Sequence, residues 1–132
     1  GSQCFVGSLD YRVDCGEALV YSNSGKTVTS YKLSQAVELF NSLNVGELMF
    51  NSIDRDGSLE GLDLATLESI SGLLNRPTLI AGGLGNWGHL LEALSKDFID
   101  GAATSNVYHL TETAMQLFRD KLTGSGIPLR KV

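Results

Sequence analysis

Apolar positions along the chain follow two different periods, and the two periods alternate. Runs that suit buried strands occur at residues 3–10, 47–53, 77–81 and 99–104. Between and after them, apolar residues recur every three or four positions, as in amphipathic helices, at 33–43, 64–74, 87–94 and 111–122. Strands that alternate with helices are typical of parallel sheets with right-handed crossovers. The pattern therefore predicts an α/β fold with four parallel strands.

One segment departs from this alternation. The β-prone residues at 18–21 and 26–29 flank the turn sequence Ser22-Asn-Ser-Gly25. Asn and Gly between β-prone segments predict a small β-hairpin, inserted between the first strand and the first helix. The first helix is expected to start near Ser30 or Lys32, and Asp63 is expected to cap the second helix.

Length, composition and charge narrow the possible classes of protein. With 132 residues, 42% of them hydrophobic, the chain is long enough for one domain with a real core. We interpret residues 1–2 as a cloning remnant and residues 3–132 as that domain. The net charge of −5 and the absence of a Lys/Arg cluster argue against nucleic acid or an anionic membrane as partner. No apolar run approaches the roughly 18 residues of a spanning helix. We therefore expect a cytoplasmic protein, in which Cys4 and Cys15 are reduced thiols.

Acids, amides, hydroxyls and glycines follow the ends of the predicted strands. They are Asp10, then Asn51 with Asp54 and Asp56, then Gly82 and Gly83, and finally Ser105 and Asn106. In parallel α/β sheets, ligands bind beyond the carboxyl ends of the strands. Asp10 there is suited to act as a general acid or base, with capping of the next turn as the alternative. The acidic loop after the second strand lacks further acidic ligands, and its Arg55 can pair with a carboxylate, so we expect neither metal nor cofactor.

A glycine-rich loop, Gly83-x-Gly85-x-x-Gly88, lies between a predicted strand and a predicted helix. It matches the dinucleotide fingerprint formally, but Val107-Tyr-His109 stands where the required acid would be. Glycines and a helix N-terminus instead favour a phosphate site, in which a Cβ at Gly83 would crowd the ligand. A second donor set at Ser105 and Asn106 would match the phosphate site of (β/α) barrels. Tight turns without a ligand remain the alternative for each loop taken singly.

Four segments together resemble the cyclase subunit of imidazole glycerol phosphate synthase. They are Asn51-Ser-Ile-Asp-Arg-Asp-Gly57 with Gly61-Leu-Asp63, then Ile80-Ala-Gly-Gly-Leu-Gly85, Ser105-Asn-Val-Tyr-His109 and Ser125-Gly-Ile-Pro-Leu-Arg130. The resemblance covers nearly the whole chain from Gln3. It implies the C-terminal half, strands five to eight, of a (β/α)8 TIM-type barrel, carrying the β-hairpin as an insert.

The resemblance also implies roles for particular residues. Asp10 matches a catalytic aspartate whose acid–base partner lies on a strand that this chain lacks. Glu47 matches a barrel-interior carboxylate at the bottom face, paired in the family with basic residues of the first half. Asn51 is a pocket residue that replaces a common Thr, which leans toward relatives associated with surface-polysaccharide amidation. The residues matching one phosphate half-site are Asp56, Gly57, Gly83, Ser105 and Asn106, of which the last two replace the usual Ala-Ser.

In that family, ammonia from a glutaminase partner reacts with a bis-phosphorylated ribulosyl-imidazole precursor in histidine biosynthesis. A half-barrel would be active as a lyase only after self-assembly or with a complementary half. The alternatives are a non-catalytic phosphate-binding module and a cyclase-like protein of surface-polysaccharide amidation. We also expect a homodimer or higher homo-oligomer, because a half-barrel leaves unpaired strand edges and an exposed inner face. The residues expected on that face are Val6, Met49, Leu79 or Ile80, and Ala103.

Overall fold

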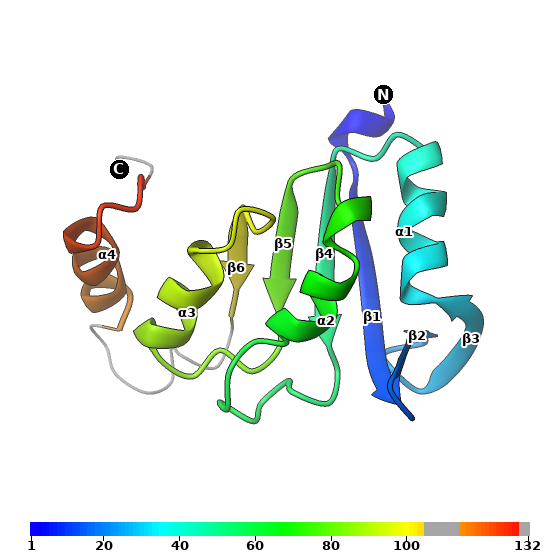
Figure 1. The fold of residues 1–132 in the computed structure, drawn as a ribbon, viewed down its shortest axis with the longest axis horizontal. Helices are drawn as coiled ribbons and strands as arrows, with labels where there is room; N and C mark the ends of the chain where they lie inside the picture. Colours follow the sequence, from blue (N-terminus) through cyan, green and yellow to red (C-terminus); the bar gives the residue numbers. More distant parts are fainter. Residues whose placement is uncertain (105–113, 130–132) are drawn as a thin grey trace.

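The computed structural model describes residues 1–104 and 114–129, and its sheet has six strands (Figure 1). In sheet order these are β3 (Thr27–Lys32), β2 (Glu17–Ser22), β1 (Val6–Asp14), β4 (Glu47–Ser52), β5 (Thr78–Ala81) and β6 (Gly101–Ala103). The helices are α1 (Leu33–Ser42), α2 (Leu64–Ser69), α3 (Trp87–Leu94) and α4 (Ala114–Gly124), with short 3-10 turns at Ser2–Cys4 and Ser71–Leu73. Strands β1, β4, β5 and β6 pair in parallel in that order, which confirms the predicted α/β fold.

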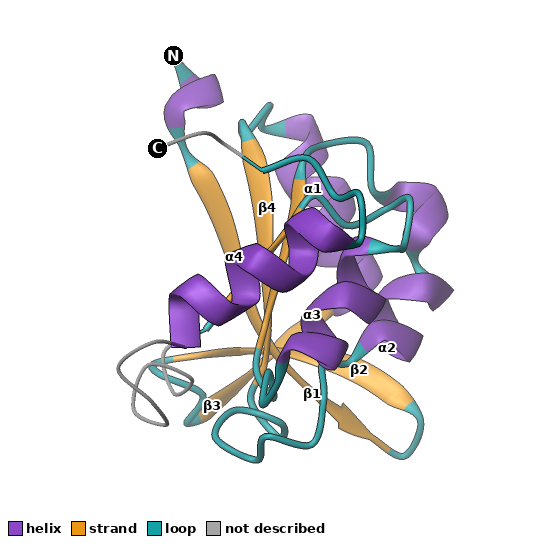
Figure 2. Cartoon of the chain, turned by 90° about the vertical axis from the view of Figure 1, so that its left-hand side faces the viewer, coloured by secondary structure: helices purple, strands orange, loops and turns teal. Residues whose placement is uncertain are grey.

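Helices cover one face of the parallel strands. Figure 2 shows α1, α2 and α3 together on one side of these strands. The residues beneath them are fully or almost fully buried, and they include Leu9, Leu48, Phe50 and Ile80. Because side chains alternate along a strand, the neighbouring residues of each strand face the opposite side of the sheet. On that side, Val6 is 50% exposed. In the part of the chain that the structure describes, no helix covers that side, which we call the open face.

The register of the strands decides which residues share the open face. Met49 pairs with Ser8 on one side and with Leu79 on the other, and Leu79 pairs with Gly101. These residues therefore lie in one row across the sheet, with Val6 and Ala103 on the same face. The residues expected on the inner face thus lie together on the open face, and of Leu79 and Ile80 it is Leu79 that lies there. Ile80 is fully buried on the helix-covered side.

The first strand is longer than its pattern predicted. Instead of ending at Asp10, β1 continues to Asp14 and pairs antiparallel with β2. Cys15 and Gly16 form the two-residue turn between them, both with positive φ, at 48° and 82°. This backbone suits the right-handed twist of a hairpin, but Cys-Gly lacks the Asn-Gly signature by which such turns are recognised. The predicted hairpin between β2 and β3 is confirmed. The pattern missed a second hairpin, which β1 and β2 form.

Local side chains start the helices where the sequence indicated. The Lys32 backbone N–H donates to Gln35 Oε1 at 3.0 Å, which fixes the start of α1. Asp63 Oδ1 accepts from the Thr66 backbone N–H at 3.4 Å at the start of α2, as predicted. The second helix is shorter than its apolar stripe, because Ile70 leaves helical geometry and a 3-10 turn follows it.

Candidate functional site

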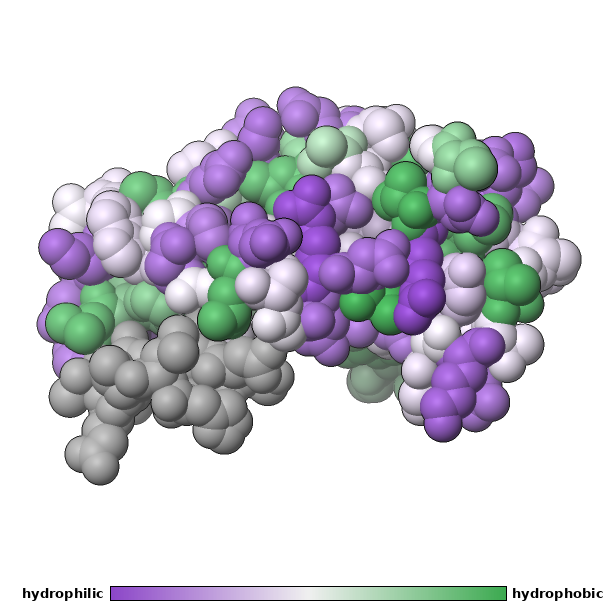
Figure 3. Space-filling view, turned by 90° about the horizontal axis from the view of Figure 1, so that it is seen from below, coloured by the Kyte–Doolittle hydropathy of each residue, from purple (hydrophilic) through white to green (hydrophobic). Residues whose placement is uncertain are grey.

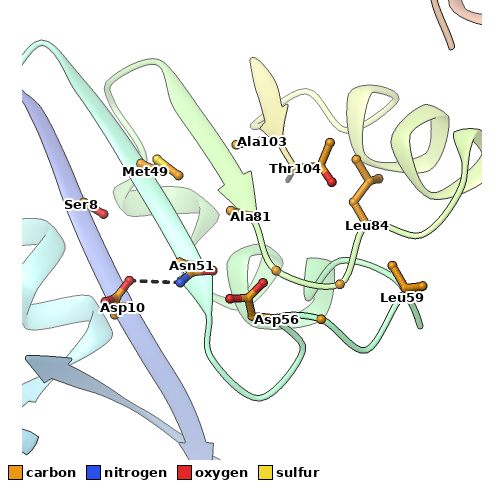
Figure 4. A pocket seen from close by; sticks show the side chains of 13 residues that line it. Ser8, Asp10, Met49, Asn51, Asp56, Leu59, Ala81, Leu84, Ala103 and Thr104 are labelled. Carbon is orange, nitrogen blue, oxygen red and sulfur yellow. Dashed lines mark hydrogen bonds between the residues drawn. The ribbon is translucent and has the colours of Figure 1, made fainter. Parts of the chain in front are cut away.

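A pocket of about 320 Å³ lies at the carboxyl ends of the parallel strands. Asp10, Asn51, Asp56, Gly57 and Gly83 all line it, so the structure brings five of the predicted site residues together (Figure 4). The rest of the lining is Ser8, Met49, Leu59, Ala81, Gly82, Leu84, Ala103 and Thr104. In Figure 3, which views this end of the molecule, hydrophilic residues form a band across the middle of the surface.

The strand register places Asp10 and Asn51 side by side on the open face. The two residues are direct partners in the parallel pairing of β1 with β4. Asn51 Nδ2 donates to Asp10 Oδ1 at 3.2 Å (Figure 4). Both side chains are half-buried. One carboxylate oxygen of Asp10 is thereby held by an amide, and the side chain lines the pocket.

The two glycines after β5 allow the backbone to turn sharply beside the pocket. Gly82 and Gly83 have φ angles of +90° and +97°, which side chains rarely adopt. A Cβ on Gly83 would lie 2.2 Å from the carbonyl oxygen of Gly61. The expected crowding of a ligand by a Cβ at Gly83 stays a prediction, and the structure adds a second obstacle within the protein. The added atom would meet the protein's own backbone, because the Gly61 N–H already donates to Gly83 O at 2.8 Å.

The loop after β4 carries another glycine of the pocket lining, Gly57. The backbone N–H groups of Arg55 and Asp56 both donate to Ser52 O, at 3.2 and 3.0 Å, and form a tight turn. Gly57 follows with a φ of +79°. The Arg55 side chain donates to Gly61 O at 3.1 Å and lies 4.0 Å from Asp63, as the predicted pairing with a carboxylate requires. The loop is therefore tied to itself and to the turn after β5.

A buried hydrogen bond that the sequence did not reveal anchors this loop to β1. The Tyr11 hydroxyl donates to Asp63 Oδ2 at 3.0 Å, and both residues are buried. Burial, with the neighbouring Asp63 charge adding to it, raises the pKa of Tyr11 well above its usual range. Tyr11 therefore stays a neutral donor, and Asp63 serves Tyr11, Thr66 and Arg55 together.

Other predicted residues lie elsewhere. Glu47 is exposed at the first position of β4, at the opposite end of the strand from Asn51, and does not line the pocket. Ser105 and Asn106 lie outside the described residues. His89 supports the turn after β5, since the Gly85 N–H donates to its Nδ1 at 3.3 Å. Ser8 and Thr104 are polar lining residues that the sequence analysis did not single out; for Ser8, its place two residues before Asp10 was the available signal.

The geometry supports two kinds of chemistry in one pocket. Asp10 presents a carboxylate that can exchange a proton with a ligand. Opposite it, glycines with left-handed backbone bring main-chain atoms to the pocket surface, as in sites that hold phosphates. No group of three or more His, Cys, Asp or Glu side chains arranged to hold a metal occurs among residues 1–104 and 114–129. In the same ranges, no helix is long and apolar enough to cross a membrane.

Comparison with known proteins shows which family the chain resembles in sequence. A family model described as histidine biosynthesis protein matches residues 1–114, which include the entire described pocket lining. The chain is 34% identical over 130 residues to the imidazole glycerol phosphate synthase subunit HisF of Chlorobaculum parvum. It is 32% identical to the same subunit of Pelodictyon phaeoclathratiforme and 29% identical to that of Chlorobium limicola.

Each of these alignments covers 98% of this chain and 52% of the relative. The chain therefore spans about half the length of the curated relatives that it matches. The family model covers most of the chain and the whole parallel part of its sheet. This chain belongs to the histidine biosynthesis protein family.

Proposed function

We propose that the chain supplies one half of the active site of a cyclase of the imidazole glycerol phosphate synthase type. The observation that carries this proposal is the meeting of Asp10 with the glycine-bearing loops after β4 and β5 in one pocket. In the proposal, Asp10 exchanges a proton with the substrate, and the loops at Gly57 and Gly83 hold one substrate phosphate. A volume of about 320 Å³ is at the small end of the range for small-molecule sites. It suits one end of a longer substrate.

The proposed substrate is a bis-phosphorylated precursor that reacts with ammonia. In the proposal, one phosphate lies beside Gly57 and Gly83, and Ser105 and Asn106 are further donors to it. The second phosphate and the acid–base partner of Asp10 would come from a complementary half. This division agrees with relatives that are about twice as long as the chain. The parallel strands β1, β4, β5 and β6 are then strands five to eight of a (β/α)8 barrel.

The sheet offers two places where further strands would join. On the edge of β1 opposite β4, strand β2 pairs only with residues Asp10–Asp14, which leaves the segment Val6–Leu9 open. The outer edge of β6 has no partner strand among the described residues. A second copy related by a twofold axis would pair β1 of each copy with β6 of the other and would cover the open face. We therefore propose a homodimer, with a glutaminase as a further partner of the closed barrel.

The test combines binding, assembly and turnover. Inorganic phosphate should raise the melting temperature of the chain, and Ala103→Leu, which fills the pocket from the open face, should abolish that rise. Ala65→Leu, on the exposed face of α2, is the matched control. Turnover of the bis-phosphorylated precursor with ammonia is measured for the chain alone and after mixing with the first half of the Chlorobaculum parvum relative, and Asp10→Asn should abolish it. Sedimentation equilibrium at micromolar concentration should show a dimer.

A non-catalytic phosphate-binding module is the second candidate function. One observation favours it: the contact that Asp10 makes within the described residues is with an amide, that of Asn51. Without the acid–base partner that the proposal assigns to a complementary half, Asp10 can still orient a ligand. Stabilisation by phosphate without turnover in any mixture would establish this second function. If inorganic phosphate does not stabilise the chain, both proposed functions are wrong.

A further inference from the structure

One residue of the pocket lining has a backbone conformation that its side chain disfavours. Leu59, in the loop after β4, has a φ of +62° and lines the pocket. A left-handed backbone costs free energy in a residue with a bulky side chain. In the described part of the chain, the other non-glycine residues with positive φ lie in hairpin turns or directly after α1: Cys15, Asn23, Ser24 and Asn44. Leu59 occupies neither kind of position, so local turn chemistry does not account for it.

Burial of the side chain does not account for this conformation either. Leu59 is 36% exposed, whereas the leucines of the core are at most 8% exposed. Glycines with positive φ stand two residues before and two residues after it, at Gly57 and Gly61. A glycine at 59 would therefore suit the same loop without strain. Strain that burial does not offset is typical of residues with a functional task.

The neighbouring turn holds Leu59 in place. Gly85, in the turn after β5, lies directly against it, since a Cβ on Gly85 would be 2.3 Å from the carbonyl oxygen of Leu59. Two residues further along both segments, the Gly61 N–H donates to Gly83 O at 2.8 Å. The backbone at Leu59 is thus held by the turn after β5 and does not shift easily to make room for a ligand.

Leu59 stands at the end of the pocket that is opposite Asp10. Figure 4 shows Asp10 at one side of the pocket and Leu59 with Leu84 at the other, with Asp56 between them. The strand order agrees with this view, because Leu59 lies against the turn after β5, and β4 separates β5 from the strand of Asp10. Leu84 is buried, so at this end Leu59 offers exposed apolar surface to a ligand.

The proposed phosphate position decides which part of a ligand meets this surface. With a phosphate at Gly57 and Gly83 and the rest of the ligand extending toward Asp10, Leu59 lies beyond the phosphate. Its side chain offers no hydrogen bond to a polar group placed there. A substituent on that side of the phosphate would also overlap with the leucine, which costs free energy as overpacking does.

We propose that Leu59 is a specificity-determining residue, which forms an end wall of the pocket and admits only a phosphate that terminates its ligand. Phosphate monoesters fit this description. Phosphodiesters, which carry a group on both sides of the phosphate, do not, and the pocket rejects them by exclusion. The inference rests on the proposed phosphate site and deepens it, because it names the residue that selects among phosphate compounds there.

Calorimetric titration with propyl phosphate and with methyl propyl phosphate tests the end wall. The second compound carries one more methyl group, on the far side of the phosphate. The two also differ in charge, so the measured quantity is the ratio of their affinities, compared between the wild-type chain and each variant. The wild-type chain should prefer the monoester, and Leu59→Gly should reduce that preference about tenfold, because it removes the overlap with the added methyl group.

Further variants separate the volume of the side chain from the strain of the backbone. Leu59→Ala removes most of the wall but keeps a Cβ on the left-handed backbone, so it should lose the preference as Leu59→Gly does. Leu59→Asn has a side chain of similar size in a residue that tolerates this backbone, so it should keep most of the preference. Leu43→Ala is the matched control, because Leu43 is a 55% exposed leucine between α1 and β4, at the opposite end of the strands from the pocket.

The possible results are distinguishable. If Leu59→Gly and Leu59→Ala keep the wild-type preference while propyl phosphate still binds, the end wall is wrong and the proposed phosphate site stands. A loss of preference in Leu59→Gly alone would assign the effect to backbone mobility and would also overturn the role of the side chain. If neither propyl phosphate nor inorganic phosphate binds the wild-type chain, the proposed phosphate site is wrong and the inference falls with it. The melting temperature of Leu59→Gly should not fall, because glycine suits the positive φ.

Discussion

The covered face and the open face of the parallel strands are built from alternate residues of the same segments, and they serve different purposes. On the covered face, Leu48 and Phe50 are fully buried beneath helices. On the open face, the residues between and beside them are Glu47, Met49 and Asn51, which are exposed or half-buried. A period of two residues thus separates packing from chemistry within one strand. A substitution at neighbouring positions should therefore affect either stability or ligand binding, and rarely both.

The difference in burial between the two faces also explains where polar groups are tolerated. Beside the covered face, at the start of α2, a buried acid, Asp63, is tolerated only because Tyr11, Thr66 and Arg55 all contact it. On the open face, Asp10 has one described hydrogen bond, with Asn51. An acid with few protein partners keeps capacity for a ligand, whereas an acid with several partners holds elements together.

The largest expected effect comes from removing core volume on the covered face. Phe50→Ala should lower the free energy of unfolding by about 3–5 kcal/mol, because it deletes a fully buried aromatic ring. Met49→Ala, one residue away on the open face, should cost less than about 1 kcal/mol in the monomer. Urea unfolding at low protein concentration measures both values, with Phe50→Leu as the milder variant if Phe50→Ala does not fold.

Raising the protein concentration sharpens this first comparison. In the proposed dimer the open face is covered, so the cost of Met49→Ala should rise with concentration while that of Phe50→Ala stays constant. Equal costs for the two substitutions at low concentration would mean that the open face is already packed in the monomer, and the division between the faces would fail.

The next effect concerns the buried hydroxyl that joins β1 to the loop after β4. Tyr11→Phe should lower the free energy of unfolding by about 1–3 kcal/mol, because Asp63 loses a buried donor. The pKa of Tyr11 is raised in the folded state, so above about pH 10 the unfolded chain releases the proton first. Stability should therefore fall as pH rises through that value, by up to about 1.4 kcal/mol per pH unit.

Tyr11→Phe should lose this part of the pH dependence, and urea unfolding across the alkaline range tests it. Tyr31→Phe is the matched control, because Tyr31 is 46% exposed on β3. If the wild-type chain and Tyr11→Phe lose stability in parallel above pH 10, the alkaline loss arises elsewhere. The Tyr11 hydroxyl would then not be the group whose titration lowers the stability.

Much of this architecture could be predicted, because local patterns were enough for it. The alternation of strands and helices, the helix starts at Lys32 and Asp63, and the gathering of Asp10 with Gly57 and Gly83 all follow from period, capping chemistry and the geometry of parallel sheets. Each of these features depends on a short stretch of sequence or on a general rule about strand ends.

The features that were missed depend on contacts between distant residues or on unusual turns. Tyr11 and Asp63 are 52 positions apart, so no local pattern indicates their hydrogen bond. The extension of β1 past Asp10 is stabilised by pairing with β2 through a Cys-Gly turn, where the usual turn signature is absent. The structural constraint on Gly83 was missed because the atom that a Cβ there would meet, the carbonyl oxygen of Gly61, comes from another loop.

The smallest expected effect on stability belongs to the residue that the proposal places at the centre of the chemistry. Asp10→Asn should change the free energy of unfolding by less than about 0.5 kcal/mol, because the amide oxygen can still accept from Asn51 at this half-exposed position. The same substitution at Asp63 should lower the free energy of unfolding by about 1–3 kcal/mol, because one of the two buried oxygens that accept hydrogen bonds would become an NH2 donor. Urea unfolding of the two variants under identical conditions makes the comparison direct. An equal loss at both positions would place Asp10 among the residues that hold the sheet together, and a near-zero loss at Asp10 alone would mark a carboxylate that is available to a ligand.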